Sequence, residues 1–574
     1  MSDEAWRAHE RRWRQEPSDQ DALGRAIAGL RRSGLVVPPD LLDARLEPAT
    51  AVETTLPLEV WAVLPGEREP TTVGWGPGRV AIPPHRSWGV GDVPAGVEGL
   101  GLLGDELRAR AIPGLRLPQL APSRRRPEDG PHLDRAGLAA LGPQPQLRWL
   151  DLPRRGVQRV TPGEVVRALR CTALEVLRGE FLLGDARADE VLGARLEGFE
   201  ELRHLRELEL DECPLLHDDL RTLAGLPELD AVSILGAALD VGQLVRAGLG
   251  PRLRGLTLDV PFGDADLAAL SALGGLTRLR AAVDDLSPAF AGALVTALPR
   301  LTTLELSEAG SSFEGTLLDA ALKRLATSRL ERLTVVSGAR LGDDGLAAVR
   351  SIPTLRAFGG GARHRHEGAS SAADFGPLES LDVQCDGPCW PALAQAERLR
   401  ALWLHGGAAD AALDAIGRLP ALVRLSLSVG RASRTPTLHL PRLESLELRD
   451  PLTSTEVVAP LRSLRLRRER RPGTFHGTDG SLAGLERLEL LTGLGDADLA
   501  PLQRLQALRV LELHLIDRVG SDLPDRVLEL LRALPGLRRV RLGAGSGPPG
   551  ALAEVHRVAR GWIAEELPWI AVVD

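Results

Sequence analysis

The chain has 574 residues and a net charge of −8, and its 44% apolar and 26% charged residues exclude a disordered chain. No apolar run approaches the roughly 18 residues of a membrane span, and the charged N-terminal segment lacks the apolar stretch of a signal peptide. The net acidity argues against a general nucleic-acid binder, whose domains are normally basic.

Residue usage indicates the kind of gene and the compartment. Asn and Tyr are absent, and Lys323 is the only lysine beside 69 arginines. Because codons for Asn, Tyr and Lys are rich in A and T, we expect a GC-rich bacterial gene. The four cysteines (Cys171, Cys213, Cys385 and Cys389) are too few and too scattered for a disulfide scaffold. We therefore predict a cytoplasmic protein that does not contact a membrane.

Residues 1–48 are predicted to form two helices, at 4–15 and 21–32. The second helix has apolar residues at i, i+4 and i+7, namely Leu23, Ile27 and Leu30. Pro17 and Asp19 lie between the two helices, and Arg-Ser-Gly closes the second. With these residues the segment resembles the small helical repeat-companion domain at the start of some bacterial repeat proteins.

Residues 49–96 have a different character, with three tryptophans (Trp61, Trp75 and Trp88) among β-like runs such as LEVWAVL and GRVAIPP. Stacked repeats follow this segment, and the first unit of such an array needs a cover for its apolar face. We therefore predict a β-rich N-terminal cap. A small independent binding module is the alternative.

From residue 97 to residue 548 the chain repeats the unit L-x-x-L-x-L at a mean period of about 24 residues. The leucines of L-x-L alternate with polar residues, which predicts a strand with one apolar face. Clear copies begin at Leu147, Leu205, Leu253, Leu301, Leu399, Leu422, Leu443, Leu461, Leu485 and Leu508. Looser copies begin at Leu174, Leu229, Leu330, Leu378 and Leu537, and degenerate copies begin at Leu279 and Leu355.

The other half of the period predicts a short helix. Many copies continue with an acidic residue and a short apolar pattern, as in GDADLAALSALGGL. An acidic side chain at such a position accepts backbone N–H groups at the start of a helix. We expect Asp264, Asp343 and Asp496 to be N-cap residues.

This period and pattern resemble the leucine-rich repeat family. The stretch from Leu205 to Leu215 matches the family's L-x-x-L-x-L-x-x-C-x-L pattern and places Cys213 at a buried structural position. The helix half is most similar to the helical, cysteine-containing type. The resemblance implies an α/β solenoid, with a curved parallel sheet on its concave side and short helices on its convex side.

Two details complete the expected solenoid. Residues 549–574 are predicted to cap its C-terminal end with a helix and a final strand. The family usually places Asn or Cys three residues after L-x-L, whereas this chain holds Pro261, Ala309, Gly338, Gly407, Gly430 or Glu469 there. We therefore expect looser loops than the family has.

No P-loop, G-x-S-x-G, H-E-x-x-H or dinucleotide-binding glycine motif occurs in a fitting context, so we predict neither an enzyme nor a cofactor. One metal-like group remains, in which the pairs His364, His366 and Cys385, Cys389 follow adjacent predicted strands. Four ligands at one end of neighbouring units could hold tetrahedral zinc. The favoured alternative is a solvated loop with reduced thiols, because neither pair has the usual zinc-ligand spacing.

A partner would meet the polar residue between the two leucines of each L-x-L, which points to the concave face. Trp403 is a large apolar side chain on this otherwise polar face, and tryptophan is enriched at binding hot spots. Arg465 lies between Glu447 and Glu489 in successive strands and begins an arginine run. The candidate partner-binding residues are Trp403, His405, Asp382, Glu447, Arg465, Arg467 and Glu489.

The sequence thus predicts a scaffold or adaptor that binds a partner protein on the concave repeat surface. The partner's identity does not follow from the sequence. A first alternative is a targeting or regulatory subunit with an activity, ligand or metal site in residues 1–96 or in the His/Cys group. A second, which the net acidity disfavours, is nucleic-acid binding through the arginines of 462–471.

Overall fold

A computed structural model describes residues between 50 and 573, with interruptions. The helices predicted within 1–48, the C-terminal cap helix and Asp496 lie outside the described residues. Those residues are 50–56, 58–63, 70–83, 85, 87–91, 96–117, 133–152, 157–158, 160–182, 195–211, 213, 215–236, 239–262, 264–283, 286–308, 315–336, 340–359, 363–364, 375, 377–385, 393–405, 410–428, 437–449, 456–467, 482–494, 500–515, 523–544, 567 and 570–573.

The chain divides into two compact units, residues 1–229 and 230–574. The strands of the first unit are β1 (Thr50–Thr54), β2 (Glu59–Val63), β3 (Thr71–Trp75), β4 (Gly78–Ile82), β5 (Ser87–Gly91), β6 (Gly114–Arg116), β7 (Trp149–Asp151), β8 (Val157–Gln158), β9 (Val176–Leu182) and β10 (Glu207–Asp211). One sheet runs in the order β3, β2, β5, β6, β7, β9, β10, antiparallel up to β5 and parallel from there on. β8 pairs with β9, and β1 pairs with β4 separately.

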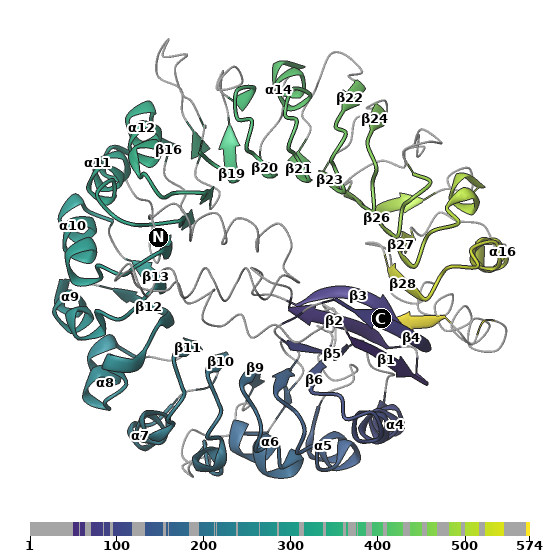
Figure 1. Ribbon diagram of the computed structural model, residues 1–574, viewed down its shortest axis with the longest axis horizontal. Coiled ribbons are helices and arrows are strands. Elements are labelled where there is room, and N and C mark those ends of the chain that lie inside the picture. The colour runs from purple at the N-terminus through teal and green to yellow at the C-terminus, as the bar shows by residue number, and fades with distance from the viewer. Residues whose placement is uncertain are drawn as a thin grey trace, which may run out of the picture. The chain divides into compact units, whose positions relative to one another are not determined.

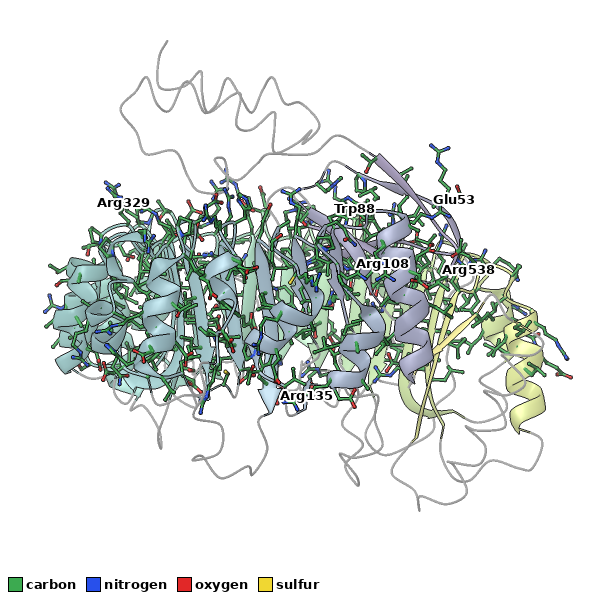
Figure 2. All side chains as sticks on the ribbon, turned by 90° about the horizontal axis from the view of Figure 1, so that it is seen from below. Glu53, Trp88, Arg108, Arg135, Arg329 and Arg538 are labelled. Carbon is green, nitrogen blue, oxygen red and sulfur yellow. The ribbon has the colours of Figure 1, made fainter. Side chains whose placement is uncertain are left out.

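Side-chain contacts tie successive helices of the first unit together. Its helices are α4 (Gly96–Ala109), α5 (Arg135–Leu141), α6 (Pro162–Leu169), the 3₁₀ helix η1 (Phe199–Glu201) and α7 (His217–Gly225). Nη1 of Arg108 donates to the carbonyl oxygen of Leu141 at 2.9 Å, which joins the end of α4 to the end of α5. Nη2 of Arg135 lies 2.6 Å from Glu164, which joins α5 to α6. Figure 2 labels both arginines.

The second unit is built on a long parallel sheet. Its strands are β11 (Ala231–Leu235), β12 (Gly255–Phe262), β13 (Arg278–Val283), β14 (Thr303–Glu308), β15 (Arg332–Val336), β16 (Arg340–Leu341), β17 (Ala357–Gly359), β18 (Arg363–His364), β19 (Ser380–Cys385), β20 (Ala401–His405), β21 (Arg424–Ser428), β22 (Thr437–His439), β23 (Ser445–Arg449), β24 (Glu456–Val458), β25 (Ser463–Arg467), β26 (Arg487–Leu494), β27 (Val510–Leu515), β28 (Arg539–Ala544) and β29 (Ala571–Val573). The main sheet takes them in chain order from β11 to β29, without β16, β18, β22 and β24. β16 and β18 continue this pairing as far as β19, and β22 pairs with β24.

Short helices connect these strands and lie on one face of the sheet, as α8 to α12 show in Figure 1. We call the opposite face of the sheet its open face. They are α8 (Val241–Arg246), η2 (Gly250–Arg252), α9 (Asp264–Leu270), η3 (Ser271–Leu273), α10 (Pro288–Ala297), α11 (Gly315–Leu325), α12 (Asp343–Ser351), α14 (Asp410–Ile416), η4 (Ala500–Arg504) and α16 (Leu523–Arg532). Among the residues that the structure describes, no helix combines the length and apolarity needed to cross a membrane.

The three leucines of each L-x-x-L-x-L unit form the core between the strands and the helices. Leu485, Leu488 and Leu490 of one copy are all buried. The first leucine of a copy also donates its N–H to the carbonyl three residues earlier, as Leu485 does to Leu482. Leu276, not Leu279, makes this bond to Leu273, so the copy predicted to begin at Leu279 begins three residues earlier. The fold is an α/β leucine-rich repeat solenoid.

A backbone ladder holds neighbouring repeats in register at the start of the strands. One carbonyl in each repeat accepts two consecutive N–H groups of the next repeat, as Glu444 does from Arg462 and Ser463 at 2.8 and 3.0 Å. The same pattern recurs between neighbouring repeats from Asp230 to Val510. Buried backbone groups are therefore satisfied at this edge of the sheet without an asparagine.

The predicted N-caps are displaced by one position. Asp264 and Asp343 are the first residues of α9 and α12, and Gly342 is the N-cap of α12. The N-caps whose side chains accept an N–H group, among the described residues, are Asp134, Thr161, Asp240 and Ser287, at 2.8, 3.2, 2.7 and 3.1 Å. Of the six loop positions without asparagine, only Pro261 is described, and the pairing of β12 with β13 shifts register there.

Two glycines, Gly89 and Gly114, make room for Trp61 to lie across neighbouring strands of the first unit. Trp61 of β2, Gly89 of β5, Gly114 of β6 and Trp149 of β7 lie in one row across four neighbouring strands. The rings of Trp61 and Trp149 approach to 5.6 Å between centroids, and both residues are buried. A Cβ at Gly114 would lie 2.6 Å from Cη2 of Trp61 and 2.5 Å from the carbonyl oxygen of Trp88. The tryptophan contact therefore requires glycine at this position.

Gly114→Ala is expected to lower the free energy of unfolding by about 1–3 kcal/mol, because the added methyl overpacks the contact between Trp61 and the backbone. Urea denaturation followed by tryptophan fluorescence measures this loss. Gly225→Ala is the matched control, because Gly225 lies in α7 with open space where the added methyl would be, and alanine favours helix by roughly 0.5–1 kcal/mol. Equal stabilities of the two variants would contradict the packing account.

Candidate protein-binding surface

The strands of the second unit place Trp403 on the open face of the sheet. In β20 Leu402 and Leu404 are buried in the core, while Trp403 between them is half-buried on the opposite face. In the neighbouring strands Asp382 and Ser426 occupy the same row. Ser426 is buried although serine is small and polar, so this part of the face is closely packed.

His405 and Asp382 contact each other next to Trp403. Nε2 of His405 lies 2.8 Å from Oδ1 of Asp382, and the pair is ionic when the imidazole is protonated. The two atoms approach each other without the alignment of a hydrogen bond, and Oδ1 of Asp382 accepts none from the described residues. The structure thus brings three of the predicted site residues together on two adjacent strands.

Arg465 lies between two glutamates, as the sequence predicts. The register places Glu447, Arg465 and Glu489 side by side in β23, β25 and β26. Nε of Arg465 contacts Oε2 of Glu489, and its Nη1 lies 4.0 Å from Oε2 of Glu447. The predicted cross-strand ladder is therefore confirmed, whereas its role in binding stays a prediction.

Two further arginines belong to this group and were missed from the sequence. Nε of Arg449 lies 3.2 Å from Oε1 of Glu447, and Nη2 of Arg487 lies 2.6 Å from Oε1 of Glu489. Each arginine is two residues from its glutamate in the same strand. The tripeptides E-L-R and R-L-E carry the signal, because side chains two apart in a strand share a face. We name Arg449, Glu447, Arg465, Glu489 and Arg487 the arginine cluster.

The other predicted residues are placed only in part. Arg467 ends β25 and pairs in register with Arg449 and Leu491, but its side chain is not among those described. The register of β18 and β19 sets His364 directly beside Cys385. Their side chains, and His366 and Cys389 altogether, lie outside the described part of the chain. Zinc binding by this group therefore stays the less favoured of the two hypotheses, beside a solvated loop with reduced thiols.

The two cysteines whose side chains are described are buried thiols. Burial raises the pKa of Cys171 to about 12. It also raises the pKa of Cys213 to about 12, although the nearby Arg195 acts in the opposite direction. Both thiols stay protonated at neutral pH and are poor nucleophiles and metal ligands. The prediction that Cys213 is a buried structural thiol is confirmed.

Comparison with known proteins yields structural similarity alone. No family model and no curated protein matches the chain. A solved structure of TLR13 with ssRNA13 is similar at 17% identity and a TM-score of 0.32, over 75% of this chain and 63% of that one. An internalin C2 from Listeria monocytogenes is similar at 20% identity and a TM-score of 0.23, over 33% of this chain and 75% of that one. The chain thus spans about 63% of the TLR13 chain that it matches.

Glu489→Gln is expected to lower the free energy of unfolding by about 1–2 kcal/mol, because the buried carboxylate that Arg465 and Arg487 share would be lost. The loss stays below that of a fully buried pair, since both arginines remain partly hydrated. Urea denaturation gives the value. Glu305→Gln serves as a control: its contact to Arg280 joins side chains that are 32% and 54% exposed, and we expect a loss below about 1 kcal/mol. A larger loss for Glu305→Gln than for Glu489→Gln would show that the arginine cluster does not stabilise the sheet.

Proposed function

We propose that the chain is a non-enzymatic scaffold or adaptor whose second unit binds a partner protein on the open face of its sheet. The observation that carries this proposal is the half-buried Trp403 beside Asp382 and His405, in a row that is otherwise polar from β19 to β28. Protein interfaces are rich in tryptophan and arginine and place them near the centre of the contact. The arginine cluster begins on β23, separated from β20 only by β21.

The row across the sheet supports this choice of face. From β19 to β28 it carries Asp382, Trp403, Ser426, Glu447, Arg465, Glu489, Glu512 and Arg541. One large aromatic side chain within a polar and charged row can act as an anchor, and the charged residues around it can set the partner's orientation. Capture of a nucleic acid or a metal instead of a protein would favour the alternatives named above.

The variant that tests this proposal must preserve the fold. A glutamate at position 465 would lie between Glu447 and Glu489, and three like charges would destabilise the sheet. Glutamine keeps the length and polarity of the side chain and removes only its charge. Trp403→Ala combined with Arg465→Gln is therefore the appropriate double variant.

The tagged full chain is expected to capture a protein from cells of its own host, identified by mass spectrometry, and the double variant is expected to lose most of it. Losing a central tryptophan costs about 2 kcal/mol or more at an interface, which is roughly thirtyfold in affinity. Circular dichroism melting shows whether the variant is folded.

The matched control is Thr257→Ala with Arg280→Gln, which changes two residues in the same row on β12 and β13. It should retain the captured protein. Loss of that protein in both double variants, or in neither while both stay folded, would place the binding surface elsewhere.

A further inference from the structure

The arginine cluster buries its carboxylates and presents its guanidinium groups. The side chains of Glu447 and Glu489 are 19% and 4% exposed, whereas those of Arg449, Arg465 and Arg487 are 40%, 36% and 43% exposed. A molecule that approaches this face therefore meets three cationic groups, and the negative charges lie beneath them. Each guanidinium has five N–H donors, which the contacts to two carboxylates do not exhaust.

An ion-pair group in the first unit has the opposite arrangement, with the arginine more buried than its glutamates. There Arg178 lies 2.6 Å from Glu207 and 3.8 Å from Glu209, on the adjacent strand β10. The arginine is 11% exposed, and the glutamates are 28% and 25% exposed. The same ion-pair chemistry can therefore bury the cation instead of the carboxylate. Single arginines elsewhere are also more exposed than the carboxylates they contact, as Arg280 is beside Glu305 at 54% and 32%. What distinguishes β23, β25 and β26 is that three such guanidinium groups lie on adjacent strands.

The face around the arginine cluster is also positively charged. Among outward positions of β21 to β28 whose side chains are described, the acidic residues are Glu447, Glu489 and Glu512. The basic residues there outnumber them and are Arg424, Arg449, Arg465, Arg487 and Arg541. This positive face belongs to a chain whose net charge is −8. A local field opposite to the overall charge attracts and orients a partner of complementary charge.

We propose that the arginine cluster binds an extended acidic segment of the partner protein, with Arg449, Arg465 and Arg487 each taking a carboxylate. This inference rests on the proposed function and names the chemistry of the partner. The planar guanidinium matches a carboxylate in two parallel hydrogen bonds. Arg449, Arg465 and Arg487 lie on a diagonal across three adjacent strands, with steps of about 7–8 Å between Cα atoms. Alternate side chains of an extended peptide are about 6.6–7 Å apart, so acidic residues at alternate positions fit this diagonal.

The observations favour a peptide over a nucleic acid. Proteins that bind single strands stack successive bases on several aromatic side chains, whereas the described outward positions of β19 to β28 carry aromatic rings on β20 alone, those of Trp403 and His405. An acidic peptide needs only carboxylate contacts of the kind that these arginines already make to Glu447 and Glu489.

Fluorescence anisotropy with the full-length chain tests this inference, with fluorescein-labelled decaglutamate as the probe. We expect saturable binding at about 50 mM sodium chloride that weakens at about 200 mM, because salt screens exposed charges. A labelled single strand of decathymidylate is measured beside it and should bind more weakly at both concentrations.

The test variant is Arg449→Gln, Arg465→Gln, Arg487→Gln and Glu489→Gln together, which removes the three cations and Glu489, the more deeply buried of the two carboxylates. It should bind decaglutamate about tenfold more weakly or worse. The matched control Arg278→Gln, Arg280→Gln and Arg332→Gln removes three arginines from the same face on β13 and β15, and its affinity should change by less than about threefold.

Three results would overturn the inference. They are absence of decaglutamate binding by the folded wild type, equal losses in the test and control variants, and stronger binding of decathymidylate that depends on the same arginines. If the test variant unfolds at a lower temperature than the wild type, the double variant Arg449→Gln with Arg487→Gln is measured in its place. In that variant Arg465 still contacts both glutamates. If decaglutamate fails but the variant at Trp403 and Arg465 still loses the captured protein, the proposed function holds and the acidic-segment inference alone is wrong.

Discussion

Burial of three leucines per repeat is the constraint on which the rest of this structure depends. A single L-x-x-L-x-L unit cannot cover its own leucines, so each repeat needs a neighbour on both sides. Leu485, Leu488 and Leu490 are buried in this way, and so are Leu508, Leu511 and Leu513 of the next copy, whereas Leu466 of the preceding copy is half-buried. Burying a leucine side chain contributes about 1.5–3 kcal/mol, so the leucine rows far outweigh any single ion pair on the surface. The backbone ladder then sets each strand in register with the next.

Because the leucines hold the repeats together, the residues on the open face of the sheet can differ from one repeat to the next. Every second residue of each strand points away from the leucine core, so its identity can change without loss of the fold. In the first unit the face near β7 is covered by Trp61, which lies over Gly89 and Gly114. In the second unit the corresponding face carries Trp403 and the arginine cluster. The proposed function and the acidic-segment inference both rest on this difference in composition.

Much of the fold can be predicted from the sequence, because the leucines that become buried recur at a regular spacing along the chain. Errors arise where a local pattern has two neighbouring solutions. Gly342 takes the N-cap that we assigned to Asp343, and Leu276 begins the copy that we assigned to Leu279. Arg449 and Arg487 were missed because the prediction paired charges only across neighbouring strands, whereas these arginines contact Glu447 and Glu489 within their own strands. The contact of Trp61 with Trp149 depends on the order of four strands, which no local pattern contains.

Hydroxyl-radical footprinting of the full chain, with and without the protein it captures, tests the central claim most directly. Tryptophan is oxidised readily when exposed, and Trp403 is half-buried on the open face of the second unit. Trp88 (Figure 2), half-buried in β5 of the first unit, is the internal control. We predict that the partner slows oxidation of Trp403 about tenfold and leaves Trp88 unchanged. Unchanged oxidation of Trp403 in the saturated complex would contradict a partner surface on the open face of the second unit.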